Sequence, residues 1–219
     1  MNKTEFQKKW ENFWYYYKWH TIAGVFVLLL VSVFIKDMVT KEKYDATVML
    51  ATSYYVDDAK TEQLKATLEP YFTDIDGNGE VNLFILPIYM EGGVGSESGD
   101  MQHAYAMQMK MVSEISVNPS MIFIFDEGFA DTFVNQMEAR NLEADFPDNP
   151  LIQGTCWDIA ASEIGGQTFI AEYEQAVGSK YYASITNGTQ VKKEAEVVEY
   201  EAILQAFHNM INNTNKNAQ

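Results

Sequence analysis

The sequence predicts an α/β fold in which an N-terminal transmembrane helix precedes one β-α-β-α-β domain with a mainly parallel sheet and a long C-terminal helix. Three observations support this prediction. The segment from Thr21 to Ile35 is apolar and carries no charge. Between residues 44 and 138, short β-rich segments alternate with segments of helical spacing, an order typical of parallel strands with right-handed crossovers. The last periodic segment, residues 191–211, is long and amphipathic.

The N-terminal region is typical of a membrane anchor. Its fifteen uncharged residues, 21–35, fall short of the ~20 that span a bilayer core, so the flanks must contribute. Before them stand aromatic residues of the kind found at headgroup level: Phe13, Trp14, Tyr15, Tyr16, Tyr17 and Trp19. We assign residues 1–13 to a cytoplasmic amphipathic segment and residues 14–39 to a single transmembrane anchor. A cleaved signal peptide is the alternative, but no small-residue cleavage pattern follows Ile35.

The distribution of charge predicts the orientation of the chain. Residues 1–43 hold seven lysines against four acidic residues, a net charge of +3. The remaining residues hold eight basic and 27 acidic groups, a net charge of −19. Because positive flanks stay inside, we expect a cell-membrane protein with a cytoplasmic N-terminus and an extracytoplasmic body. A body this acidic repels phosphate backbones, which disfavours nucleic acid as a partner.

Aromatic side chains at the N-terminus share one helical face by their spacing: Phe6, Trp10, Phe13, Trp14 and Tyr17. One interpretation is a lead-in to the span that lies at the membrane interface. The other is a docking face for a second membrane protein. The residues leave both interpretations open.

The first half of the body predicts two helices between three strands. Three segments are rich in β-forming residues: 44–53, 80–89 and 120–125. Two segments have apolar residues at helical spacing: 57–72 and 101–117. Asp57 or Asp58 is the expected N-cap of the first helix. A Gly/Ser-rich loop is expected at residues 91–100.

The second half of the body is less regular. The expected elements are a helix at 127–138, a loop at 146–150, a short strand within 151–159, a helix at 169–176 and a strand at 180–185. The C-terminal helix, 191–211, is expected to direct five apolar residues toward the core: Val198, Ala202, Leu204, Phe207 and Ile211. Together these elements predict one domain over residues 44–213, followed by a polar, disordered tail at 214–219.

Four short features recur in a known family. They are Thr52-Ser53-Tyr54-Tyr55 after the opening strand, Ser113-Glu114-Ile115 near a helix end, the Asn118-Pro119 turn, and Asp126 at a strand end. In this order they resemble the first lobe of extracellular solute-binding proteins of transporters, over roughly residues 44–130. The chain is also similar to small membrane-anchored proteins of gut Firmicutes with a Lys/Trp/Tyr-rich start. The resemblance implies solute binding, although a clamshell needs a second lobe that this chain is too short to hold.

Candidate ligand-binding residues follow from the same expected sheet. In an open parallel sheet, ligands sit beyond the carboxyl ends of the strands. Those ends carry Ser53, Tyr54, Tyr55, Tyr89 and Asp126. The alternative is that these are ordinary loop residues that bind no ligand. We therefore expect a membrane-anchored extracytoplasmic binding protein, a single solute-binding-like lobe that engages a small solute or another surface protein. The alternative function is an accessory subunit of a membrane complex that docks through its aromatic N-terminal helix.

One motif has metal chemistry. The run from Asp74 to Glu80 matches the first half of a calcium loop, with Asp74, Asp76 and Asn78 as alternating oxygen ligands and Glu80 as a carbonyl ligand. Its twelfth position is Ile85, so the usual bidentate Glu is missing and a distant carboxylate would have to complete the site. We expect weak, structural Ca²⁺ binding or, as the alternative, a metal-free turn.

Motifs for catalysis are absent from the sequence. It holds no G-x-S-x-G, no H-E-x-x-H and no Gly-rich phosphate loop. The single cysteine, Cys156, has no evident catalytic partner and excludes an intramolecular disulfide. We therefore expect that the protein is not an enzyme.

Overall fold

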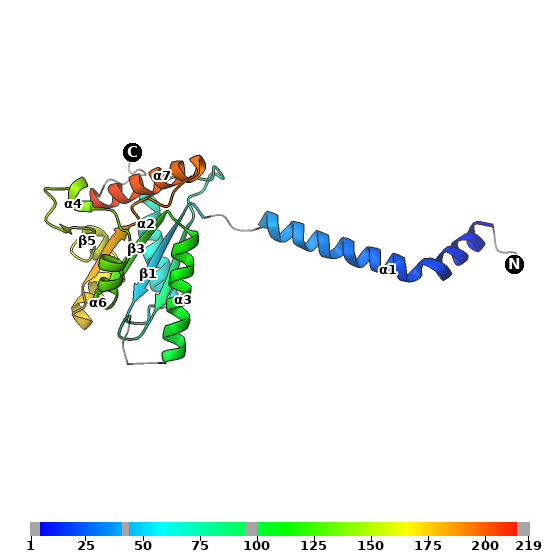
Figure 1. Ribbon diagram of the computed structural model, residues 1–219, viewed down its shortest axis with the longest axis horizontal. Helices are drawn as coiled ribbons and strands as arrows, with labels where there is room; N and C mark the ends of the chain where they lie inside the picture. The colour runs from blue at the N-terminus through cyan, green and yellow to red at the C-terminus, as the bar shows by residue number, and fades with distance from the viewer. Residues whose placement is uncertain (1–4, 41–43, 95–99, 214–219) are drawn as a thin grey trace. The chain divides into compact units, whose positions relative to one another are not determined.

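The N-terminal part of the chain is one helix. The computed structural model of the 219-residue chain describes residues 5–40, 44–94 and 100–213 and divides the chain into two compact units, Met1–Lys43 and Tyr44–Gln219. In the first, α1 runs from Glu5 to Thr40 (Figure 1). The stretch from Phe13 to Phe34 reaches a mean hydropathy of 1.6 over 18 residues, so this helix is long and apolar enough to cross a membrane, a property that N-terminal signal sequences share. The expected apolar helix is therefore confirmed.

A six-stranded sheet forms the centre of the second unit, which we call the body. Its strands are β1 (Ala46–Thr52), β2 (Leu83–Tyr89), β3 (Met121–Asp126), β4 (Ile152–Gln153), β5 (Cys156–Asp158) and β6 (Tyr181–Ile185). Their order across the sheet is β2-β1-β3-β6-β5-β4. The pairs β1–β2 and β1–β3 are parallel, which confirms the predicted β-α-β-α-β unit.

The remaining strands make the sheet a mixed one, mainly but not purely parallel. β6 pairs antiparallel with β3, and β5 and β4 continue antiparallel beside it. β6 begins beside the end of β3, where the main-chain N–H of Glu127 donates to the carbonyl oxygen of Lys180 at 3.2 Å. The strand must therefore run back along β3. An apolar strand pattern marks burial, and it carries no information on direction.

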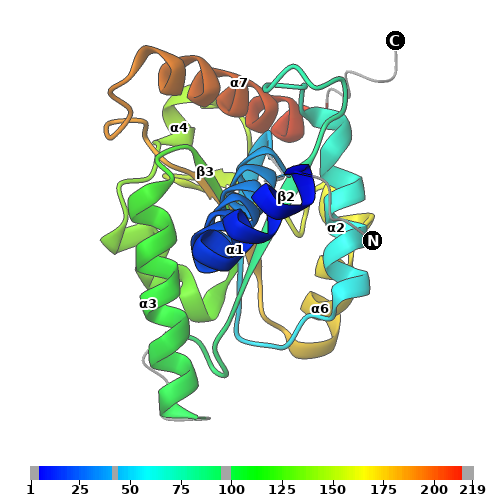
Figure 2. The ribbon, with the colours of Figure 1, turned by 90° about the vertical axis from the view of Figure 1, so that its right-hand side faces the viewer.

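Helices cover the two faces of the sheet unequally. α2 (Asp58–Leu68), α5 (Glu163–Gly166), α6 (Phe169–Val177) and α7 (Glu194–Ile211) contribute to one core cluster, and α3 (Met101–Val117) contributes to the other. Figure 2 shows α3 on the side of the sheet opposite α2 and α6. Because side chains alternate along a strand, Val48 and Leu50 belong to the first cluster and Met49 and Ala51 to the second.

The structure contains the helix predicted before β3 but not the regular helix predicted after it. α3 has the expected bounds, because the Asp100 carboxylate caps it by accepting from the N–H of Gln102 at 2.9 Å. The helix expected at 127–138 is instead a 3₁₀ turn, Glu127–Phe129, followed by a π-helix, Thr132–Gln136. Packing explains the distortion: the ring of Phe133 stacks on that of Phe125 with centroids 4.7 Å apart.

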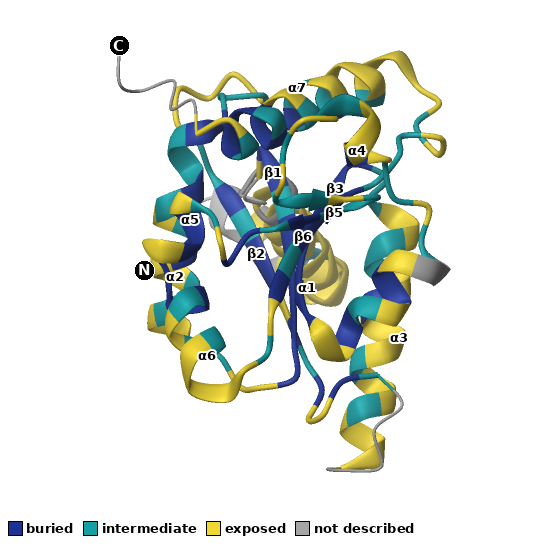
Figure 3. Cartoon of the chain, turned by 90° about the vertical axis from the view of Figure 1, so that its left-hand side faces the viewer, coloured by how far each residue is buried: buried dark blue, intermediate teal, exposed yellow. Residues whose placement is uncertain are grey.

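Two further differences concern residues near the C-terminus. A short helix, α4 (Leu142–Asp145), was not expected. In α7, Val198 is exposed rather than directed to the core, and the buried positions include Ile203, Phe207 and Met210. Phe207 is buried as expected, and Leu204 and Ile211 are partly buried against the same core, so only Val198 was clearly misplaced. Figure 3 shows the buried strands between partly exposed helices. The predicted tail at 214–219 lies outside the described residues.

Candidate functional site

The carboxyl ends of β1, β2 and β3 share one edge of the sheet, and Asp126 lies buried at that edge. Its side chain is 0% exposed. One carboxylate oxygen accepts the main-chain N–H of Ser53 at 2.6 Å, and the other accepts the Ser53 hydroxyl at 2.9 Å and the N–H of Gly128 at 3.0 Å. Burial raises the pKa of Asp126 despite these donors. The carboxylate thus joins two strand ends and does not face solvent.

Two glycines close this edge further. The N–H of Val94 donates to the carbonyl oxygen of Gly128 at 3.2 Å, and the N–H of Met90 donates to that of Thr52 at 3.1 Å. Gly93 has φ +85°, and a Cβ built on it collides with the Gly128 main chain. The loop after β2 therefore lies directly against the loop after β3, where an open parallel sheet leaves its ligand crevice.

Tyrosines form the exposed part of the same edge. Tyr55 is 66% exposed and Tyr54 is 38% exposed. The Tyr55 ring lies edge-on to the half-buried Tyr89 ring at 6.1 Å, and Tyr89 lies 6.1 Å from the His103 ring of α3. We call Tyr54, Tyr55, Tyr89 and His103 the tyrosine edge.

The tyrosine edge is held from the helix side. The Tyr173 hydroxyl of α6 donates to the carbonyl oxygen of Tyr55 at 3.1 Å and accepts from the Lys60 ammonium of α2 at 3.2 Å. The Lys60 ammonium also lies 4.5 Å from the centre of the Tyr173 ring. A residue of α6, more than a hundred positions away in the sequence, thus holds the loop that carries Tyr55 and the start of α2.

Of the five predicted ligand-binding residues, the structure separates the side chains into two groups. Ser53 and Asp126 are buried and bond to each other, whereas Tyr54 and Tyr55 are exposed and Tyr89 is half-buried. Sequence reasoning missed Tyr181, which pairs with Asp126 across β3 and β6. The Tyr181 hydroxyl is buried without a hydrogen-bond partner in the described part of the chain, and burial, with the nearby Asp126 carboxylate, raises its pKa. No residue pattern marks such a cross-strand pair.

The predicted calcium loop gains a carboxylate from outside the motif. Oxygens of Asp45, Asp74 and Asp76 lie within 4.8 Å of one another, and Glu80 lies outside this group. Asp45 precedes β1 and is 2% exposed. Its carboxylate accepts the N–H groups of Ile75 at 2.6 Å and of Asn82 at 2.8 Å, which fixes the loop to the root of β1 and β2.

Main-chain donors stabilise the charged loop. The Asp74 carboxylate accepts the N–H groups of Gly79 at 2.7 Å, Gly77 at 2.6 Å and Asn78 at 3.1 Å, and these bonds, chiefly that from Gly79, lower its pKa. The Asn78 side-chain oxygen accepts the N–H of Glu80 at 2.8 Å. The loop therefore favours the ionised form of Asp74, the form that a hard cation requires.

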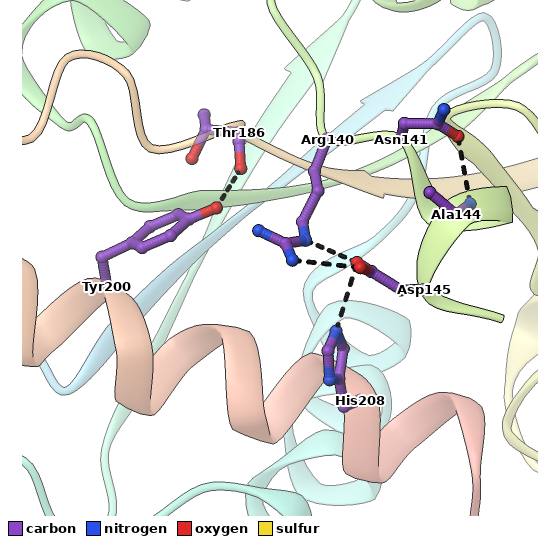
Figure 4. A network of polar contacts seen from close by, with 7 residues as sticks. All are labelled: Arg140, Asn141, Ala144, Asp145, Thr186, Tyr200 and His208. Atoms are coloured by element: carbon purple, nitrogen blue, oxygen red, sulfur yellow. Dashed lines mark hydrogen bonds and ion pairs between the residues drawn. The ribbon is translucent and has the colours of Figure 1, made fainter.

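A third polar group joins α4 to α7 and has a structural character (Figure 4). The Arg140 guanidinium donates to both oxygens of Asp145, at 2.5 and 3.1 Å, and His208 Nε2 lies 3.7 Å from the same carboxylate. The His208 ring also meets the Phe146 ring edge-on at 4.9 Å. Burial lowers the pKa of His208, so the neutral imidazole is favoured here.

Comparison with protein-family models, with curated proteins and with solved structures gives no match. The resemblance to a solute-binding lobe therefore stays a prediction.

Proposed function

We propose that the chain is a membrane-anchored extracytoplasmic binding protein that engages another surface protein through its tyrosine edge and performs no catalysis. One observation carries the proposal: at the edge where an α/β sheet presents its ligand site, the carboxylate is internal and the tyrosines are outside. Exposed tyrosines supply large, rigid contact area and are enriched at protein–protein interfaces. A small enclosed solute is less well supported, because Gly93 and Gly128 close the crevice.

The N-terminal helix supports the proposed location of the body at the outer side of the membrane. α1 is the apolar helix that would hold the body at the membrane, and the lysine excess at the N-terminus favours a cytoplasmic start. The acidic body then lies away from the anionic inner leaflet.

Substitution of the exposed tyrosines tests the proposal. The full chain is extracted from its native membrane in a mild detergent, and the size of its complex is measured on a native gel. We expect Tyr54→Ala with Tyr55→Ala to release the chain to its uncomplexed size. Tyr105→Ala is the matched control, because Tyr105 of α3 is similarly exposed, at 65%. An unchanged complex in the double variant would contradict the tyrosine edge as the contact.

The second candidate function is an accessory subunit that docks through α1. The observation that favours it is the aromatic group at the start of the helix, where Phe13 stacks on Tyr17 at 5.3 Å and Trp10 lies 6.1 Å from Phe13. In the same native gel, Trp10→Leu with Trp14→Leu would release the chain if α1 makes the contact. Under the proposed function this pair of changes leaves the complex intact.

For the acidic loop we propose a weak, structural calcium ion held by Asp74 and Asp76 of the motif, with Asp45 as the distant carboxylate. Three hard oxygens within 4.8 Å support this, together with the additional oxygen ligands that Asn78 and the Glu80 carbonyl offer in the motif. Extracellular modules of this kind bind Ca²⁺ with dissociation constants of about 10⁻⁴–10⁻³ M.

A further inference from the structure

The face of the sheet that carries α3 has an open hollow over β4, β5 and β6. Cys156 and Tyr182 pack at the border of the α3-side core cluster, while their neighbours Trp157 and Ala183 belong to the opposite cluster. Their side chains therefore point to the α3 side of the sheet. A hollow of about 860 Å³ lies against them, a volume within the range of small-molecule sites.

Acidic groups converge on this hollow. Glu127, at the start of the 3₁₀ turn after β3, and Asp158, at the end of β5, both line it. Tyr182 lies opposite Asp158 in the β5–β6 pair, and its pKa is raised by burial first and then by the charges of Glu127 and Asp158. The Tyr182 hydroxyl makes no hydrogen bond among the described residues. Among the lining residues that the structure describes, two carboxylates therefore stand against one lysine, which gives the hollow an excess of negative charge.

Lys180 is the one basic residue among those that line the hollow in the described part of the chain. It is exposed, and within that part its ammonium forms no ion pair with Glu127 or Asp158. The body around it has a net charge of −19, which concentrates cations at its surface. Lys180 therefore weakens the negative field of the hollow without cancelling it.

The rest of the lining is partly polar, at the turn from Gln153 to Thr155, and partly apolar. Ala130 and Val134 line the hollow from the segment after β3, and Pro150 and Leu151 line it from the loop before β4. The Cys156 thiol forms part of the wall, and burial raises its pKa, so it adds no charge. A ligand that fits this wall has an apolar stem and a cationic head.

We infer that this hollow binds an organic ammonium ion carried on an apolar stem, with the head beside Glu127, Asp158 and the Tyr182 ring. Tyrosine rings attract quaternary ammonium groups through their faces, which adds to the carboxylate attraction. None of the residues of the tyrosine edge lines the hollow, so the inference goes beyond the proposed function and does not depend on it.

The single cysteine of the chain provides a local readout. The full chain in lipid nanodiscs is alkylated with iodoacetamide at mildly alkaline pH, and the rate at Cys156 is followed by mass spectrometry. Hexyltrimethylammonium is the probe, because it is cationic and does not react with the reagent. We expect it to slow alkylation in a saturable manner. Hexanoate, which has the same stem length and the opposite charge, should not. Calorimetric titration of the same probe measures the affinity directly. The inference can therefore be tested even if Cys156 is alkylated too slowly to follow.

Matched variants test which charged residues contribute to binding of the probe. Glu127→Gln and Asp158→Asn should each weaken binding of the probe about threefold, as loss of a partly exposed ion pair does. Glu62→Gln, an equal charge change at an exposed position of α2, should leave binding unaltered. Lys180→Gln should strengthen binding.

Three results would overturn the inference. They are the absence of binding by calorimetry, equal protection by hexanoate, and weaker binding in Lys180→Gln. The last would mean that the hollow takes an anionic or zwitterionic ligand. If the Tyr54 and Tyr55 variants bind the probe normally yet lose their native complex, the hollow and the tyrosine edge act separately. If the probe fails but the complex responds to those variants, only the hollow proposal falls.

Discussion

The carboxylate of Asp126 and the main-chain nitrogen of Ser53 lie 2.6 Å apart and join the carboxyl ends of β3 and β1. A second bond from the Ser53 hydroxyl, at 2.9 Å, makes the pair bidentate. Since Asp126 is fully buried, this contact determines what the carboxyl edge can present. It leaves the tyrosines as the exposed chemistry of that edge.

Asp126→Asn should destabilise the body. An amide has one acceptor oxygen, so its NH₂ group would face either the main-chain N–H of Ser53 or the Gly128 N–H together with the Ser53 hydroxyl. A buried donor left unsatisfied costs about 1–3 kcal/mol, and we expect the free energy of unfolding to fall by that amount in urea titrations. Glu62→Gln, at an exposed position of α2, is the control. An unchanged midpoint in Asp126→Asn would mean that the two strand ends do not depend on this contact.

The acidic loop has a calcium-dependent prediction. Asp76→Ala should lower the melting temperature of the full chain in 5 mM Ca²⁺, about ten times a Kd in the middle of the expected range, and should have little effect in EDTA. Asp148→Ala, at an exposed turn outside the loop, should behave alike in both buffers. Equal drops with and without calcium would show that the loop is a hydrogen-bonded turn, because Asp76 also accepts the N–H of Asn78 at 3.0 Å.

His208 predicts a loss of stability in mild acid. Its pKa in the folded protein lies below the value of about 6.5 for an unperturbed histidine, chiefly because it is buried. The folded state therefore prefers the neutral ring. The resulting stability is complete above pH about 6.5 and declines as the pH falls through the folded-state pKa. His208→Gln should flatten the pH dependence of the melting temperature over that window, and a variant as pH-sensitive as the wild type would contradict the assignment.

The orientation of the anchor has its own test. Protease added to intact cells should cut the body while sparing the first 15 or so residues, because lysine-rich flanks stay in the cytoplasm. Epitope tags at the two termini report which fragments survive. Loss of the N-terminal tag with an intact body would reverse the proposed topology.

Local patterns predicted α1, α2, α3 and the three parallel strands, because apolar periodicity and, for α2, the cap Asp57 are encoded within a few residues. Relations between distant segments were not predictable. Asp45 lies some thirty residues before the loop that it completes, and the antiparallel direction of β6 has no residue signature. Burial of Asp126 was missed for a similar reason. An acid at a strand end is usually exposed, and only the fold supplies the donors of Ser53 and Gly128.

The central claim is that the tyrosine edge contacts another protein at the cell surface. A photoreactive amino acid placed at Tyr55, and separately at the similarly exposed Val198 of α7, measures this directly in intact cells. The account predicts one discrete protein adduct from position 55, lost when Tyr54 and Tyr89 are changed to alanine, and no such adduct from position 198. Equal adducts from both positions, or none from position 55, would contradict it.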